Sequence, residues 1–418
     1  MNIIRNIKGT HDIIPPETKH WRKLEGIVND NCSKFGFEEI RSPIFEQTKL
    51  FLRSVGEETD IVSKEMYTWI DRDGTSLTLR PELTASIVRS YIQNNLGAKS
   101  PNQKLYYMGP LFRRERPQKG RQRQFHQFGV EALGSEHPEM DAEIISIAWN
   151  ILSDCGLSHT TQLQLNSIGS KKCRDTFKEA LKSYLLPFLD EFSETSQKRF
   201  SENTLRMLDT KSKDEQLILN NAPKISEFYT EEDQDHFDTL KKLLTDINIP
   251  FKINPKLVRG LDYYSRTVFE FTCSELGAQD AILGGGRYDN LVENLGGKPT
   301  PGIGFAAGME RFLIAMDNKD DQPQIDIYSA CIVKDGLSAS LSISNKLRKL
   351  GFSVITDSLR RSLKSQMREA NKMGAKYIII LGEEELKEEV FIVKDLKKSV
   401  QSIFQETELM KFFENLTI

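Results

Sequence analysis

The sequence predicts an α+β fold in two parts. A large N-terminal part of strands and helices carries a mostly helical insertion, and a small α/β domain follows it. Three observations support this division. Two long strand patterns flank a basic loop at residues 104–133. Residues from about 170 to 250 are mostly helical, with an acidic stretch at 190–240, and strand and helix patterns alternate after a polar linker at 317–323.

The first element is an amphipathic helix. Apolar residues recur near a 3.6-residue period from Trp21 to Phe35, and Gly36 stands where a glycine commonly follows a helix. Residues 37–44 then read as a strand. Because Pro43 has no N–H to donate, we expect this strand at a sheet edge or ending there.

A short strand over residues 77–80 leads into the next helix. Pro81 suits the first helical turn, where its missing N–H costs nothing, and Glu82 and Thr84 fall in the same turn. A carboxylate in this place can stabilise the helix N-terminus or bind a ligand. Both readings remain open at this point.

The two long strands, Lys104–Glu115 and Arg123–Leu133, are joined by a loop at residues 116–122. Residues 113–123 include six basic side chains and one acidic one. Arginine presents a planar fork that matches phosphate oxygens. The charge therefore indicates an anion-binding loop, although a solvated surface loop would have the same composition.

The period of two on the second strand separates polar from apolar side chains. Phe125, Gln127 and Glu131 share one face, whereas His126 shares the other with residues suited to packing. Polar side chains on a central strand are costly unless they are paired or face a ligand. We expect the first face to meet a ligand and His126 to be structural. Arg113 and Glu115 likewise share one face of the preceding strand.

The remaining strands of the first part lie beyond the insertion. They are expected at residues 263–273 and 281–283 and in the stretch before Gly304. Gly284–Gly286 lets a backbone approach another group closely but is weak evidence alone. Arg311 is expected on a helix that begins among the small residues 304–308.

The last part alternates strands and helices from Ile327 to Lys394, which predicts a mostly parallel sheet. Residues 346–376 contain nine basic and two acidic side chains. Arg360, Lys364 and Arg368 recur on one helix face. This face is either solvated or binds nucleic acid.

Composition excludes several classes of protein. The net charge of −3 excludes a polycation, and no window approaches the roughly 18 apolar residues of a membrane span. Five dispersed cysteines without a Cys-x-x-Cys pair argue against a zinc site or a disulfide framework, so a cytoplasmic location is expected. A P-loop is also missing from the sequence.

Five segments together resemble a known family. Residues 37–51, 112–127 and 304–311 resemble motifs 1, 2 and 3 of the class II aminoacyl-tRNA synthetases. Residues 257–264 (Leu-Val-Arg-Gly-Leu-Asp-Tyr-Tyr) and 284–289 (Gly-Gly-Gly-Arg-Tyr-Asp) resemble signatures of the histidyl-tRNA synthetases. The chain is therefore identified as a member of that family.

The resemblance implies a catalytic core over residues 1–324, built on an antiparallel β-sheet flanked by helices. It further implies that the insertion at about 170–250 lies near the tRNA acceptor arm and that residues 326–418 bind the anticodon. The family is homodimeric. It uses ATP with Mg²⁺ to convert L-histidine to histidyl-adenylate, transfers histidine to tRNA(His), and releases AMP and pyrophosphate.

The resemblance also implies roles for individual residues and no protein ligand to a metal. Two arginines at the α-phosphate would be catalytic: Arg113 and Arg259. The remaining ATP-binding positions are Glu115, Arg121, Phe125 and Arg311. The histidine-binding positions are Glu82, Thr84, Gln127, Glu131, Arg259, Tyr263, Tyr264, Gly284, Gly285 and Gly286.

Two other readings compete with this one. A paralogue without catalysis, the regulatory subunit of ATP phosphoribosyltransferase, shares the core fold but usually lacks the last domain and loses the ATP-site arginines. A nucleic-acid-binding protein without catalysis would explain the basic stretches. It would not explain Glu82, Gln127 and Glu131.

Overall fold

The computed structural model describes residues 3–56, 59, 61–118, 120–210, 212–277, 280–316 and 325–416. The chain forms two compact units, Met1–Asp317 and Asn318–Ile418. Each unit is described by itself. The linker expected at 317–323 lies outside the described residues.

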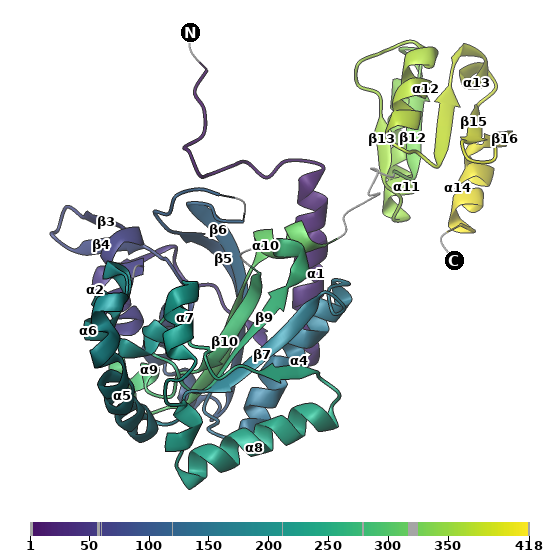
Figure 1. The fold of residues 1–418 in the computed structure, drawn as a ribbon. Helices are drawn as coiled ribbons and strands as arrows, with labels where there is room; N and C mark the ends of the chain where they lie inside the picture. Colours follow the sequence, from purple (N-terminus) through teal and green to yellow (C-terminus); the bar gives the residue numbers. More distant parts are fainter. Residues whose placement is uncertain are drawn as a thin grey trace. The chain divides into compact units, whose positions relative to one another are not determined.

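An eight-stranded sheet forms the centre of the first unit (Figure 1). Six neighbouring strands run antiparallel and a parallel pair closes each end of the sheet, which confirms the expected antiparallel core. In spatial order the strands are β1 (Glu38–Glu39), β5 (Gln103–Phe112), β6 (Gln124–Leu133), β11 (Gly302–Gly308), β10 (Ala281–Arg287), β9 (Ser265–Cys273), β7 (Thr161–Ser167) and β8 (Phe251–Ile253).

The hairpin of β5 and β6 ends earlier than the sequence predicted. β5 stops at Phe112 rather than at Glu115, because the backbone N–H of Arg114 turns away and donates to the carbonyl of Glu65 at 2.7 Å. Arg113 and Glu115 thus belong to the loop and not to the strand.

Helices α1 (Glu17–Lys34), α4 (Pro138–Asp154), α8 (Glu231–Asp246) and α10 (Met309–Ala315) share one core with the sheet. The apolar stripe of α1 is buried, as its period predicted. Phe128, Val130 and Ala132 of β6 enter the same core. The opposite face of β6 is left for a cavity.

A three-stranded sheet and several helices lie beside the central sheet. They are β2 (Phe45–Gln47), β3 (Tyr67–Ile70), β4 (Ser76–Leu79), α2 (Thr48–Val55), α3 (Thr84–Gln93), α9 (Leu291–Asn294), and the short turns Ile61–Glu65, Leu96–Ala98 and Ser274–Leu276.

Two predictions in this region were wrong. The strand expected at 37–44 is the two-residue edge strand β1, after which the chain leaves the sheet ahead of Pro43. Helix α3 begins at Thr84, so Pro81 and Glu82 precede it. Glu82 still accepts a hydrogen bond from the first turn, because its Oε1 receives the N–H of Ala85 at 2.9 Å.

The segment between β7 and β8 is almost entirely helical and has its own apolar core around Phe177, Leu181 and Leu185. Its elements are α5 (Lys171–Leu185), α6 (Glu194–Glu202), α7 (Lys213–Leu219), α8, and the short turns Leu186–Glu191, Thr204–Asp209 and Ile225–Phe228.

The second unit is a five-stranded sheet in the order β13-β12-β14-β15-β16. The prediction of a mostly parallel sheet is wrong for two of the four pairings, because β14–β15 and β15–β16 are antiparallel. Its elements are β12 (Ile327–Cys331), α11 (Leu337–Lys349), β13 (Val354–Thr356), α12 (Leu363–Lys372), β14 (Tyr377–Leu381), α13 (Glu383–Lys387), β15 (Val390–Asp395), β16 (Val400–Gln405) and α14 (Glu406–Glu414).

One expected basic face is also altered in this unit. Arg360 precedes α12, with a left-handed backbone (φ 51°), so Lys364 and Arg368 remain on the helix without it. Among the described helices of both units, none is long and apolar enough to cross a membrane.

Candidate active site

A cavity of about 310 Å³ opens on the face of the central sheet opposite the α1–α4 core. Most of the site residues expected from the sequence line it, although they come from segments far apart in the chain. They are Glu82, Thr84, Arg113, Glu115, Arg121, Phe125, Gln127, Glu131, Arg259, Tyr263, Tyr264, Gly284 and Arg311. Gly285 and Gly286 do not line the cavity.

Strand β6 forms the floor. Phe125, Gln127 and Glu131 face the cavity, while the alternate residues Phe128 and Val130 are fully buried in the core behind them. The period of two therefore assigned both faces of this strand correctly.

Glu131 is held by three hydroxyl groups at the closed end of the cavity. Its Oε1 accepts hydrogen bonds from Thr84 Oγ1 at 2.7 Å and from Tyr107 OH at 3.1 Å, and its Oε2 accepts one from Tyr288 OH. Burial raises the pKa of Glu131 to about 8, although these hydroxyl donors oppose the rise. Burial therefore disfavours the charged form of this carboxyl group more than that of an exposed glutamate.

The sequence reasoning missed both tyrosines. Tyr288 stands inside the Gly-Gly-Gly-Arg-Tyr-Asp signature, which could have drawn attention to it. Tyr107 lies in an apolar stretch of β5 and gives no comparable signal. Leu105 of β5 pairs with Glu131 of β6, and Tyr107, two residues after Leu105, points to the same face of the sheet. The Tyr107 hydroxyl therefore reaches Glu131.

Glu82 lies two residues before the start of α3, and its exposed fraction is 4%. Burial raises its pKa to about 7, while the N–H groups of Ala85 and Thr84 and the nearby charge of Arg113 oppose the rise. The helix-end reading of Glu82 is confirmed, because Oε1 accepts the N–H of Ala85 in the first turn of α3. The side chain also lines the cavity, so its binding of a ligand stays a prediction.

Arg113 is fixed from two sides. Its Nε donates to the carbonyl of Pro81 at 2.9 Å, and its guanidinium lies 5.2 Å from the centre of the Phe125 ring. Glu115 comes within 3.9 Å of Arg113 and 3.2 Å of Arg121. These contacts place an aromatic face, two guanidinium groups and one carboxylate at the same end of the cavity.

Arg259 approaches from the irregular segment before β9. Its Nη1 pairs with Glu270 of β9, and its Nη2 fills the space where a side chain at Gly284 would stand. Glu270 was missed, although a lone carboxylate within Val268–Phe271 is a recognisable signal. Gly284 is required here because any Cβ would collide with the guanidinium.

The surroundings of two glycine segments differ from expectation. Gly284–Gly286 is part of strand β10 and not a loop, and Gly304–Gly308 ends strand β11 rather than starting a helix. Both strands lie in the middle of the sheet, where close backbone packing replaces side chains. Arg311 comes from the first turn of α10 and donates to the carbonyl of Ala281.

Neither His126, for which a structural role was expected, nor His11 lines the cavity. His126 Nδ1 is 3.0 Å from Glu310 Oε1, and its ring meets the edge of Trp21 with centroids 4.8 Å apart. This agrees with the structural role expected for His126. His11 lies 3.8 Å from the carboxylate of Glu17 near the surface.

The arrangement suits a substrate with an anionic and a cationic end. Fixed guanidinium groups can hold phosphate oxygens, whereas buried carboxylates can hold an ammonium group and hydrogen-bond donors. Over the described parts of the chain, no cluster of three or more histidine, cysteine or acidic side chains could hold a metal ion. All five cysteines are buried and unpaired.

Comparisons with known proteins cover nearly the whole chain. A family model described as histidyl-tRNA synthetase matches residues 9–312, and one described as an anticodon binding domain matches residues 328–416. A histidine–tRNA ligase from Crocosphaera subtropica is 46% identical over 415 residues, which cover 98% of this chain and 95% of the relative. One from Desulfitobacterium hafniense is 45% identical over 402 residues, with 95% of each covered.

Solved structures show the same relationship. The apo histidyl-tRNA synthetase of S. aureus matches with a TM-score of 0.83 and 35% identity, covering 99% of this chain and all of that one. A Bacillus halodurans protein described as an ATP phosphoribosyltransferase regulatory subunit/histidyl-tRNA synthetase matches with a TM-score of 0.67 at 19% identity, covering 91% and 99%. The latter likeness concerns the fold alone.

Proposed function

The chain belongs to the histidyl-tRNA synthetase family and is an aminoacyl-tRNA synthetase that uses ATP to join histidine to tRNA, and from this premise we propose how its residues perform the reaction. The observation that carries the proposal is the meeting of Arg113, Arg259, Glu82 and Glu131 in one cavity. Guanidinium groups and carboxylates are thereby available to the two ends of histidyl-adenylate.

The histidine end is the part of the cavity around Glu131. Glu82, Thr84 and Gln127 hold the α-ammonium group of L-histidine, and Glu131 and Tyr264 read the imidazole ring. Tyr263 and the backbone of Gly284 close the pocket, and Gly285 and Gly286 stand behind them in β10. Glu131 already accepts hydrogen bonds from three hydroxyl groups, and an imidazole N–H would add a fourth donor. A ligand without a ring N–H would lose this hydrogen bond and would bind more weakly.

The ATP end is the part around Arg113. Phe125 stacks on the adenine and Glu115 accepts from it, while Arg121 and Arg311 hold the terminal phosphates. The contact of Arg113 with the Phe125 ring and with Pro81 supports this assignment, since it fixes the guanidinium beside the expected nucleotide.

The first chemical step is attack of the histidine carboxylate on the α-phosphorus of ATP, which expels pyrophosphate. Two anions must approach each other, so positive charge fixed at the phosphorus is the main catalytic requirement. Arg259 bridges the carboxylate and the α-phosphate, and Arg113 supports the opposite side. Holding both reactants in line lowers the entropic cost. In the second step, the terminal 3′-hydroxyl of tRNA(His) attacks the acyl phosphate and AMP leaves.

Mg²⁺ enters with ATP, bound mainly to its β- and γ-phosphates. This ion typically keeps several waters and takes few protein carboxylates when phosphates are present.

The rest of the chain serves tRNA(His) and assembly. We assign residues 1–324 to the catalytic core, with the helical insertion at about 170–250 near the acceptor arm, and residues 326–418 to the anticodon. The match of residues 328–416 to an anticodon-binding model supports the last assignment. The enzyme acts as a homodimer in the cytoplasm.

Exchange of labelled pyrophosphate into ATP tests the proposal. We expect exchange that requires L-histidine, and that disappears when another amino acid replaces it. If active-site titration shows that the protein binds ATP but no histidine-dependent exchange is found, the assignment is wrong. The regulatory-subunit alternative predicts that negative result, and no comparison favours it, since the relatives at 45–46% identity are ligases.

A further inference from the structure

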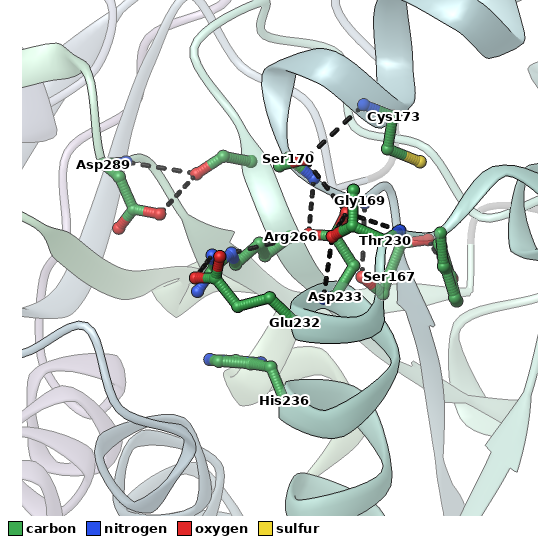
Figure 2. Close-up of polar contacts among 12 residues, drawn as sticks. Ser167, Gly169, Ser170, Cys173, Thr230, Glu232, Asp233, His236, Arg266 and Asp289 are labelled. Carbon is green, nitrogen blue, oxygen red and sulfur yellow. Dashed lines mark hydrogen bonds and ion pairs between the residues drawn. The ribbon is translucent and has the colours of Figure 1, made fainter.

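A second set of polar contacts joins the inserted helices to the start of β9 (Figure 2). At its centre lies Asp233, the third residue of α8. Its carboxylate accepts hydrogen bonds from the N–H of Ser170 at 2.9 Å and from Thr230 Oγ1 at 2.8 Å. Ser170 is the N-cap of α5 and Thr230 the N-cap of α8, so one carboxylate binds the N-termini of both helices.

Arg266, the second residue of β9, faces this carboxylate. Its Nε lies 3.7 Å from Asp233 Oδ1, and its Nη2 pairs with Glu232. The backbone of Arg266 is tied to the same place, because its N–H donates to Gly169 O at 2.9 Å and its carbonyl accepts the N–H of Ile168 at 2.7 Å. Both the side chain and the main chain of Arg266 are therefore held by the inserted segment.

The backbone of Arg266 adopts a conformation that arginine rarely takes. Its φ is 45°, in the left-handed region, and such a residue persists where its surroundings hold it. The pairing of β9 with β10 shifts register here, so that Arg266 and Thr267 form a bulge opposite the junction of Gly286 and Arg287. Bulges of this kind redirect the side chains beside them.

Tyr264 lies two residues before Arg266, at the start of the bulged segment, and lines the cavity. A Cβ placed at Gly286 would lie 3.0 Å from Cδ1 of Tyr264 and 2.5 Å from the carbonyl of Thr267. The Tyr264 ring thus occupies part of the space that a side chain at 286 would fill. Ser265, between Tyr264 and the bulge, is fixed by its 3.0 Å hydrogen bond to Asp289.

We propose that Arg266 is a positioning residue for the histidine pocket. Its contacts with Glu232 and Asp233 hold the bulge of β9, and the bulge sets the Tyr264 ring against Gly286. The inserted helices and the histidine pocket are thereby mechanically coupled. The inference rests on the proposed assignment of Tyr264 to the imidazole.

The test compares KM for histidine with KM for ATP in pyrophosphate exchange by the full-length enzyme. Arg266→Ala and Asp233→Asn should each raise KM for histidine about tenfold or more, with KM for ATP changed less than about twofold. Arg266→Lys keeps a cation facing both carboxylates and should recover part of the loss. The matched control is Glu231→Gln, which removes one exposed charge from the same turn of α8.

Circular dichroism separates this role from a general loss of structure. If Arg266→Ala does not fold, the Arg266→Lys and Asp233→Asn variants decide the matter. Equal changes in the two KM values, or a change in Glu231→Gln as large as in Asp233→Asn, would overturn the inference. Failure of the wild-type enzyme to exchange with histidine would instead overturn the proposed function.

Discussion

Thr84 Oγ1 donates a 2.7 Å hydrogen bond to Glu131 Oε1, although the two residues are 47 positions apart. Thr84 is the first residue of α3 and Glu131 lies near the end of β6. The bond ties the helix that carries the proposed ammonium site to the strand that carries the proposed imidazole site. On the proposed assignment of these residues, this contact sets the spacing between the ammonium and imidazole sites.

Replacing Gly304 should disturb the part of the pocket around Glu131. A Cβ at Gly304 would collide with Glu131 Oε2 and with the carbonyl of Val130. We expect Gly304→Ala to raise KM for histidine by about tenfold to a hundredfold, because the carboxylate must leave its hydroxyl donors. Pyrophosphate exchange at varied histidine and ATP concentrations measures the effect.

Gly26→Ala is the matched control for that substitution. Gly26 lies exposed within α1 with nothing within 4 Å of an added Cβ. Alanine there should leave exchange unchanged and stabilise the helix by about 0.5–1 kcal/mol. Unchanged histidine kinetics in Gly304→Ala would show that Glu131 does not contact the substrate.

Arg259→Ala should reduce adenylate formation far more than ATP binding. The guanidinium is proposed to act on charge that develops at the phosphorus, so we expect a loss of about 10²–10³ in kcat. The dissociation constant for ATP should change by no more than a few fold. Rapid-quench measurement of histidyl-adenylate, together with equilibrium binding of ATP, separates the two. Equal losses in both would identify Arg259 as a binding residue only.

The stability of the ligand-free protein should fall as the pH rises from about 5 to 8. The carboxyl of Glu82 loses its proton near pH 4.5 in the unfolded chain but near 7 in the folded one, where burial disfavours the charge. Between pH 4.5 and pH 7 the folded chain holds a proton on Glu82 that the unfolded chain has lost. The contribution of Glu82 to the free energy of unfolding is therefore complete below pH 4.5 and is lost as the pH rises through 7. Glu82 alone contributes on the order of 3 kcal/mol to this change.

Urea unfolding of wild type and Glu82→Gln at pH 5 and pH 8 measures that contribution. The free energy of unfolding should decline less with pH in the variant than in wild type. Part of the decline that remains in the variant comes from Glu131, whose pKa is also raised by burial. A decline of equal size in the two proteins would contradict the assigned pKa of Glu82.

Removing residues 326–418 should separate the two chemical steps. These residues lie in a compact unit distinct from the one that holds the cavity. Pyrophosphate exchange should persist, whereas charging of tRNA(His) should weaken because the anticodon contacts are gone. Charging by the truncated protein at the full-length rate would refute the anticodon assignment.

Much of the site could be predicted because strand periodicity and charge are local properties. The alternation in β6 and the basic residues of 113–123 were visible in the sequence, and the structure brings Phe125, Gln127 and Glu131 to the same cavity as Arg113. The family resemblance supplied Glu82 and Arg259, since nothing local distinguishes either residue from a cap or an ordinary ion pair.

The failures concern features that tertiary contacts decide. Small residues before Arg311 suggested a helix, but the packing of β11 between β6 and β10 makes them a central strand. The second unit was expected to be mostly parallel because strand and helix patterns alternate there, but β15 returns antiparallel to β14 and pairs with β16 in the same way. Tyr107 and the left-handed Arg266 depend on register, which one sequence does not reveal.

A crystal structure with bound histidyl-adenylate tests the central claim most directly. The account predicts the α-phosphate between Arg113 and Arg259, the adenine on Phe125, the ammonium group at Glu82 and the imidazole at Glu131. An adenylate bound in the reverse direction, or outside the cavity that these side chains line, would contradict it.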